Sequence, residues 1–153
     1  MQIFVTSKSP EACARVLDDK RVVKMVLESA QLLSTAMHLH GDTRAPYKPT
    51  HVNHPCSIWV RENINNYGWL LQHFLYLNYE YTQRFGRHHK CADYIDIFRS
   101  FADKNNCTYD EPKYFVNCSL FREVDNVFTA YQLTLNEKWG NDKTKPKWNG
   151  REY

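Results

Sequence analysis

The clearest pattern of chemically reactive residues lies between residues 18 and 41. Polar side chains recur there at steps of three and four, which places them on one face of a helix, and most of the residues between them are apolar. A surface helix normally shows the opposite balance. We therefore expect a buried helix whose narrow polar stripe opens into a cleft. The stripe consists of Arg21, Lys24, Glu28, Gln31, Thr35 and His38.

Glu28 is the central catalytic candidate of this stripe. Lys24 lies one turn before it and Gln31 one turn after it. Burial would favour the neutral form of the Glu28 carboxyl group, whereas the neighbouring cations would favour its charged form. Such opposed influences on one carboxyl group are common at sites that transfer protons. We predict that Glu28 and Lys24 act in catalysis, while Arg21 and Gln31 orient the carboxylate or the substrate. The solvent-facing side of a core helix would show the same pattern.

A second concentration of functional residue types is the segment HVNHPCSIWVREN, residues 51–63. Free backbone N–H groups at a helix start can meet anions, cationic side chains can meet phosphates, and aromatic rings can stack on bases. His54 is a catalytic candidate and a further contact to phosphate or base. The core of the protein is the alternative place for the aromatic residues. The predicted nucleic-acid contacts are His51, Asn53, Trp59, Arg61 and, further along, Arg84.

Two other chemistries fit the histidines and cysteines. His51, His54, Cys56, His88, His89 and Cys91 are zinc ligands by type. Their spacing, HxxHxC…HHxC, matches no standard zinc pattern, so we assign no metal site and expect no cofactor. Cys56 lies beside His54 at a predicted helix start, which would lower the pKa of its thiol and make it nucleophilic. A buried, inert thiol is the simpler interpretation, and we expect all five cysteines to be reduced.

The end of the chain combines basic and aromatic residues. Lysines and an arginine alternate with Trp148 and a final tyrosine over residues 141–153. That mixture suits nucleic acid, with charge for phosphates and rings for stacking. We therefore add Lys147 and Trp148 to the predicted DNA contacts. A solvated tail has a similar composition, whereas the tryptophans and Pro146 favour docking on the protein.

The elements that position these residues are predicted to be helices. Ser9-Pro10 marks a helix start, and Pro55 can begin another helix. Asp18-Asp19 can cap the second helix and Asp125 the last one. Gly41 and Gly86 mark helix ends. Asn65-Asn66 interrupts the middle of the chain, and MQIFV is a strand or an extended segment. The predicted helices cover residues 10–17, 18–41, 57–63, 66–86, 88–106 and 125–140, with loops at 41–57 and 107–124.

Composition agrees with an all-α, compact single domain spanning residues 1–153. The chain has 153 residues, of which 42% are hydrophobic and 24% charged, as in globular proteins. Its net charge of +3 permits an anionic partner without requiring one. No apolar run could span a membrane and no secretory signal is visible, so we expect a cytoplasmic protein. The oligomeric state stays open.

The order of these motifs resembles a known family. DKRVVKMVLESAQLLSTA, KPTHVNHPCSIWVREN and the C-terminal Q-x-x-L-N-E-K before P-x-W are similar to segments of small phage-type helical proteins and of the pyrimidine-dimer DNA glycosylases of the endonuclease V type. That family is compact and nearly all helical. It extrudes a base, cleaves its glycosidic bond and then nicks the strand. By this resemblance Glu28 would be the catalytic glutamate, and DNA the partner.

One feature departs from the family pattern. Its nucleophile is the α-amine left after Met1 is removed from a small second residue, and here the second residue is Gln2, which normally leaves Met1 in place. The lead hypothesis is thus an N-glycosylase acting on a damaged or modified pyrimidine in DNA, with the strand-nicking step in question. Three alternatives remain: a non-catalytic phage accessory protein that binds nucleic acid or protein, an N-glycosidic hydrolase of free nucleotides, and a helical zinc protein.

Overall fold

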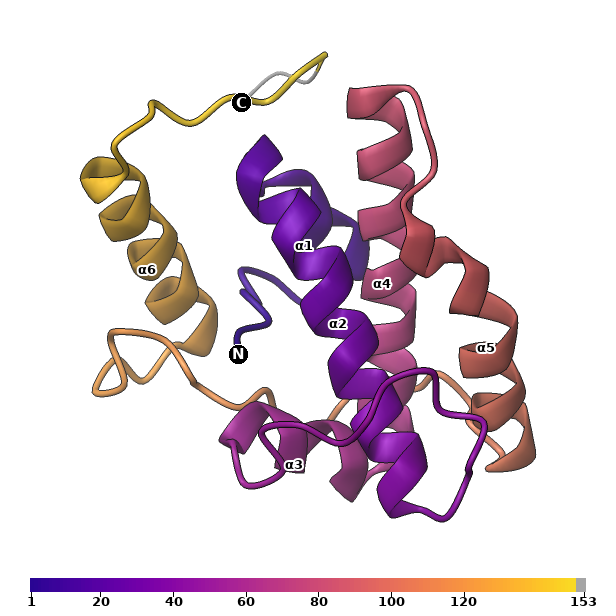
Figure 1. Cartoon of the computed structure of the whole chain (residues 1–153). Coiled ribbons are helices and arrows are strands. Elements are labelled where there is room, and N and C mark those ends of the chain that lie inside the picture. Colours follow the sequence, from indigo (N-terminus) through magenta and orange to yellow (C-terminus); the bar gives the residue numbers. More distant parts are fainter. Residues whose placement is uncertain (151–153) are drawn as a thin grey trace.

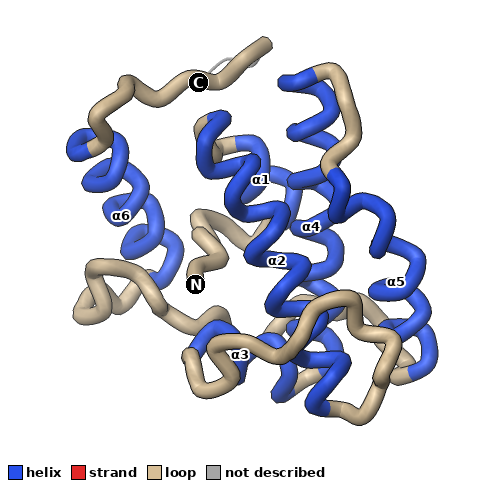
Figure 2. The backbone as a smooth tube through the Cα atoms, viewed as in Figure 1, coloured by secondary structure: helices blue, strands red, loops and turns tan. Residues whose placement is uncertain are grey.

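The computed structural model describes residues 1–150, and these contain helices and loops but no strand (Figures 1 and 2). The all-α prediction is therefore confirmed. None of the helices in this part of the chain is long and apolar enough to cross a membrane. The helices are α1 (Pro10–Arg15), α2 (Asp19–Leu39), α3 (Pro55–Glu62), α4 (Ile64–Phe85), the short 3-10 helix η1 (Lys90–Tyr94), α5 (Ile95–Lys104) and α6 (Val127–Asn141).

Helix α4 is the centre of the fold. It packs against α1, α2, α3 and α5, and Figure 1 shows α1 and α2 on one side of it and α5 on the other. Aromatic rings fill the contacts, with Phe74 meeting Phe98 edge-on at 5.4 Å and Trp59 meeting Trp69 at 6.2 Å between ring centroids. The aromatic richness of the sequence is largely used for this core, since burial of large rings is the main stabilising term in a domain of this size.

Several helix ends follow the predicted signals. Ser9 caps α1 by accepting a hydrogen bond from the Ala12 N–H at 3.1 Å, and Pro10 is the first helical residue. Pro55 likewise begins α3. Gly86 ends α4 with a φ of 71°, a left-handed conformation that glycine adopts without steric cost.

Three local predictions are wrong in detail. The carboxylate of Asp18 makes no capping bond to α2 and instead accepts hydrogen bonds from Arg21 and Trp139. The break between α3 and α4 falls at Asn63, whose side chain caps α4, rather than at residues 65–66. The cap of α6 is Asn126, not Asp125, because the Asn126 side chain accepts from the N–H groups of residues 128 and 129.

The N-terminal segment is extended and lies between α2 and α6 (Figure 1). Ile3, Phe4 and Val5 are buried, and the Gln2 side chain donates to the backbone oxygen of Cys118 at 2.6 Å. Helix α6 is tied to the start of α2 by side chains: Asp142 pairs with Arg21 at 2.8 Å. This arrangement holds the first residue of the chain inside the protein.

Burial of His73 makes stability depend on pH. The ring is fully buried on α4, its Nδ1 donates to the Pro10 carbonyl at 3.1 Å, and Nε2 has no partner among the described residues. Burial lowers the pKa of His73 to about 4. The unfolded chain, with a histidine pKa of about 6.5, then binds more protons than the folded chain between these values. The folded protein therefore keeps its full stability above about pH 6.5 and loses part of it as the pH falls from about 6.5 to about 4.

We expect the free energy of unfolding to fall by about 1.4 kcal/mol for each unit by which the pH is lowered between roughly pH 6 and 4, because of His73. The difference between wild type and His73→Phe isolates its share, because Phe keeps the ring contact with Trp69 and cannot titrate. Urea unfolding at a series of pH values measures it. Parallel pH profiles for the two proteins would show that His73 does not contribute.

Candidate active site

A cavity of about 300 Å³ lies where the N-terminal segment meets α2 and α6. The segment forms one wall, the first three turns of α2 form another, and α6 contributes a single lysine. The polar stripe predicted on this helix thus opens partly into a cavity, as Arg21, Lys24 and Glu28 all line it. The complete lining is Met1, Gln2, Phe4, Lys20, Arg21, Lys24, Met25, Glu28 and Lys138.

Glu28 faces the α-amino group of Met1 in this cavity. The amine nitrogen lies 3.7 Å from Glu28 Oε1, and the glutamate side chain is 14% exposed. The second carboxylate oxygen, Oε2, is buried and has no hydrogen-bond partner among the described residues. A buried carboxylate oxygen normally has partners, so this one keeps unused hydrogen-bonding capacity at the cavity wall. An amine and a carboxylate side by side can perform nucleophilic and acid–base chemistry.

Cationic side chains surround the mouth of the cavity. Lys20 and Lys24 are exposed and Lys138 is half-buried, and within residues 1–150 none of the three forms an ion pair. Arg21 differs, because Asp18 and Asp142 compensate its charge at 3.2 and 2.8 Å. Burial disfavours the charged guanidinium, but these two carboxylates outweigh it and raise the pKa of Arg21. The bond to Arg21, together with nearby Lys20 and Lys138, lowers the pKa of Asp142, so these lysines are partly balanced at a distance. With Lys24 they still leave the mouth with a net positive charge.

The rest of the predicted stripe serves other purposes. Gln31 is half-buried and does not line the cavity. Thr35 is buried, and its hydroxyl donates to the Thr50 carbonyl and accepts from the Thr50 N–H. These two hydrogen bonds fasten the long loop before α3 to α2. His38 is exposed near the end of the helix. The stripe is hence divided between a cavity, a loop anchor and solvent.

The segment before α3 does not join the cavity lining. His51 and Asn53 are exposed, and His51 has a φ of 49° and bonds to the Thr50 hydroxyl through Nδ1. Arg61 holds the segment by donating to the Val52 carbonyl at 2.6 Å. His54 caps α3 with Nδ1, and burial first, then the positive N-terminus, lowers its pKa. His54 is therefore close enough to the Met1 amine to feel its charge, but it does not line the cavity.

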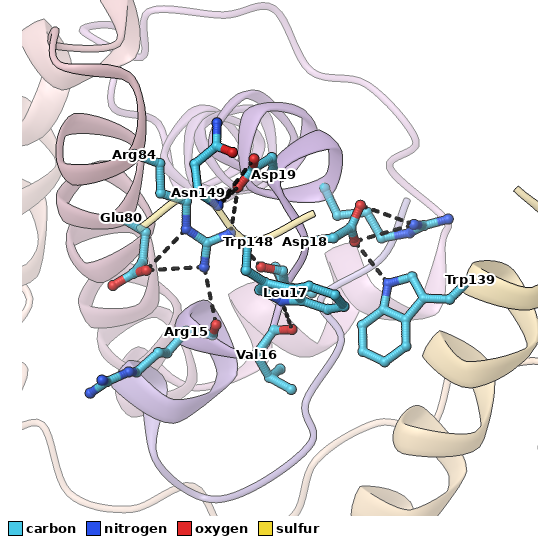
Figure 3. A network of polar contacts seen from close by, with 11 residues as sticks. Arg15, Val16, Leu17, Asp18, Asp19, Glu80, Arg84, Trp139, Trp148 and Asn149 are labelled. Atoms are coloured by element: carbon cyan, nitrogen blue, oxygen red, sulfur yellow. Dashed lines mark hydrogen bonds and ion pairs between the residues drawn. The ribbon is translucent and has the colours of Figure 1, made fainter. Parts of the chain in front are cut away.

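Two predicted nucleic-acid contacts are instead core residues. Trp59 is 1% exposed, donates its indole N–H to the Tyr114 carbonyl and packs against Phe115, so no ring face is open to a base. The side chain of Arg84 is fully buried and bonds to Glu80, Asp19 and two backbone carbonyls (Figure 3). The predictions for these two are corrected: both side chains hold the core together, which residue type and spacing alone do not distinguish.

The tail docks on the protein through its tryptophan. The Trp148 indole donates to the Val16 carbonyl at 2.9 Å and its ring meets Trp139 edge-on at 5.2 Å (Figure 3). The backbone oxygen of Lys147 accepts from Asp19 N–H, and its side chain is exposed. Residues 151–153, part of the predicted basic tail, lie outside the described residues.

Sequence reasoning missed two members of this region. Gln2 leaves the use of an N-terminal amine open, and only the fold places the Met1 amine beside Glu28. Cys118, in the loop before α6, was not connected to Cys56. Contact with Cys118, followed by burial, raises the pKa of Cys56, and the same contact lowers the pKa of Cys118. The structure therefore supports the simpler interpretation of Cys56 as a buried thiol over the alternative of a low-pKa nucleophile. No local signal links residues so far apart in the chain.

Comparison with known proteins gives one match. A family model described as pyrimidine dimer DNA glycosylase matches residues 1–94, more than half of the chain. No curated protein and no solved structure matches it. The matched part runs from the N-terminal segment through η1 and includes every cavity-lining residue except Lys138. The C-terminal motif of the resemblance and α6 lie beyond it. The chain belongs to the pyrimidine dimer DNA glycosylase family.

Proposed function

We propose that this protein is a DNA N-glycosylase that excises a damaged or modified pyrimidine. The observation that carries the proposal is the pairing of the Met1 amine with Glu28, 3.7 Å apart, in a cavity whose mouth is cationic. Family membership supports DNA as the substrate. Enzymes that act on a base in duplex DNA must extrude it, which costs a few kcal/mol that binding must recover.

Glu28 would stabilise the charge that develops on the sugar. Cleavage of a glycosidic bond passes through a transition state in which the sugar becomes positively charged. A fixed, largely buried carboxylate stabilises such charge strongly. The partnerless Oε2 of Glu28 is the atom free to do so.

The Met1 amine would supply the nucleophile. The neutral amine attacks C1′, the bond from C1′ to the base breaks, and the base leaves with a proton; loss of a proton from the nitrogen and ring opening then give an imine. The imine permits removal of a C2′ proton and elimination of the 3′ phosphate, which nicks the strand. This lyase step requires Met1 with a free amine. Without it, Glu28 would activate water and the enzyme would only remove the base.

The lysines at the mouth, together with exposed His51, Asn53 and Lys147, would contact the DNA backbone. We expect Lys24→Gln to reduce the slope of log affinity against log salt concentration by about 0.9, because one fewer phosphate is neutralised. Fluorescence anisotropy with a labelled duplex at several salt concentrations measures this slope. Lys104→Gln on α5, outside the cavity, is the control. An unchanged slope in Lys24→Gln would remove Lys24 from the DNA interface.

Borohydride trapping tests the proposal directly. The protein is incubated with a duplex that carries one cyclobutane thymine dimer, in the presence of sodium borohydride, which reduces an imine to a stable amine. We expect a covalent protein–DNA adduct that peptide mapping places on Met1, and none with an undamaged duplex. An adduct on a lysine would refute the role of the amine, and absence of both base release and adduct across pyrimidine lesions would refute the glycosylase proposal.

A further inference from the structure

A second group of reactive side chains lies next to the cavity but takes no part in its lining. It consists of His54 and Cys56 at the start of α3 and Cys118 in the loop before α6. Their ligand-type atoms lie within 4.8 Å of one another. Both cysteines are buried and the histidine is half-buried. Within residues 1–150 no other group of three or more such side chains is gathered this closely.

We propose that His54, Cys56 and Cys118 form a zinc site. Two thiolates and an imidazole are ligands that zinc prefers, and three protein ligands leave a fourth position for water. This reverses the expectation from sequence that no metal is bound, which rested on the spacing of His51, His54, Cys56, His88, His89 and Cys91 and lacked Cys118. The proposal does not depend on the glycosylase activity.

The geometry requires only a small contraction. Zinc–sulfur bonds of about 2.3 Å and zinc–nitrogen bonds of about 2.0–2.1 Å, arranged tetrahedrally, set the ligand atoms about 3.6–3.8 Å apart. The present upper limit of 4.8 Å exceeds this by about one ångström, which side-chain rotation can supply. Two thiolates and a neutral imidazole around a divalent ion carry no net charge. The charged groups nearby, Arg122, the Met1 amine and Glu28, therefore do not oppose binding.

Binding has one structural cost. His54 Nδ1 now accepts a capping hydrogen bond from the Cys56 N–H at 3.1 Å. If zinc binds Nε2, the proton of the neutral ring moves to Nδ1, and if zinc binds Nδ1, the metal uses the lone pair of that nitrogen. In both cases Nδ1 can no longer accept the hydrogen bond. One N-cap bond contributes far less than coordination of a structural zinc ion, and coordination therefore prevails.

The site would join three parts of the fold. Cys118 is fastened to α6, since its N–H donates to the Tyr131 hydroxyl at 3.0 Å. Its carbonyl accepts from the side chain of Gln2 at 2.6 Å, the residue next to the amine. A metal that links Cys118 to His54 and Cys56 would thus brace the N-terminal segment between α3 and α6, with its fourth position open to water.

The chain contains a matched control for the ligand set. His89 and Cys91 repeat the arrangement of His54 and Cys56: His89 Nδ1 accepts from the Cys91 N–H at 3.0 Å at the start of a helical turn. This pair belongs to no group of three ligands in the described part of the chain. Cys91→Ser should accordingly leave metal binding intact, whereas loss of any ligand in the proposed site should abolish it.

The test measures metal directly. We expect protein purified from zinc-supplemented medium to contain about one zinc per chain, and cobalt exchanged into the site to give the visible bands of tetrahedral coordination with a sulfur-to-cobalt band in the near ultraviolet. Cys118→Ser and His54→Asn should lose both signals; Asn retains a capping oxygen, so loss there is not a folding defect. A chelator should lower the melting temperature of wild type and not of Cys118→Ser.

Several results would overturn the zinc site. Substoichiometric zinc and no cobalt spectrum in correctly folded wild type would do so, as would unchanged binding in Cys118→Ser. An intact mass showing a Cys56–Cys118 disulfide in protein purified without reductant and lacking zinc would identify the pair as redox-active instead. Loss of zinc in Cys91→Ser would place the metal elsewhere.

Discussion

Glu28→Gln is expected to lower the rate of base release by roughly 10²- to 10⁴-fold. The substitution keeps the size and shape of the side chain and removes the negative charge beside the Met1 amine. A neutral amide cannot balance the positive charge that forms on the sugar. Single-turnover release of the base from a duplex with a defined thymine dimer measures the effect.

Binding and folding controls make this result specific. Glu11→Gln, an exposed change on α1, should leave the rate unchanged. Affinity of Glu28→Gln for the duplex should match or exceed that of wild type, because a negative charge near the DNA is removed. Base release within a few-fold of wild type in Glu28→Gln would show that Glu28 is not the catalytic carboxylate.

The second large effect is on stability. Arg84→Met should lower the free energy of unfolding by about 3–5 kcal/mol. The side chain is fully buried and bonds to Glu80, Asp19 and the carbonyls of residues 15 and 17, as Figure 3 shows. Removing the guanidinium withdraws the positive charge from buried Glu80 and leaves two carbonyls without this donor. Urea unfolding monitored by circular dichroism measures the loss.

Arg87→Met provides the comparison for Arg84. Arg87 is exposed, and its side chain donates only to the Tyr81 hydroxyl at 3.3 Å among the described contacts. We expect its replacement to change stability by less than about 0.5 kcal/mol. Arg84→Lys should not restore stability, because a single ammonium group cannot reach all the partners that the planar guanidinium of Arg84 binds. If Arg84→Met instead weakened DNA binding and left stability unchanged, Arg84 would be a DNA contact, as the sequence analysis predicted.

Local signals account for most of the secondary structure. Ser9 with Pro10, Pro55 and Gly86 set helix ends through backbone constraints that operate over a few residues, and the structure follows them. The two capping errors differ in origin. The Asp18 carboxylate is engaged by Arg21 and by the distant Trp139 instead of the N–H groups of α2. At α6 the neighbouring Asn126 makes the capping bonds, a shift of one residue.

The site divides in the same way. The helical period alone places Arg21, Lys24 and Glu28 on one face, and the apolar remainder of α2 shows that this helix is buried. The sequence thereby determined the helical class, the family and the carboxylate worth testing. It could not determine that Trp59 and Arg84 are core residues, because arginine and tryptophan have the same local signature whether they hold the core or bind a ligand.

Only the tertiary structure decided which distant groups meet. It brought the Met1 amine to Glu28, Lys138 to the same cavity, and Cys118 to His54 and Cys56. Each of these encounters depends on how the extended N-terminal segment and α6 pack beside α2 and α3. Such packing follows from the summed burial of many side chains, whereas sequence motifs report only what neighbours along the chain can do.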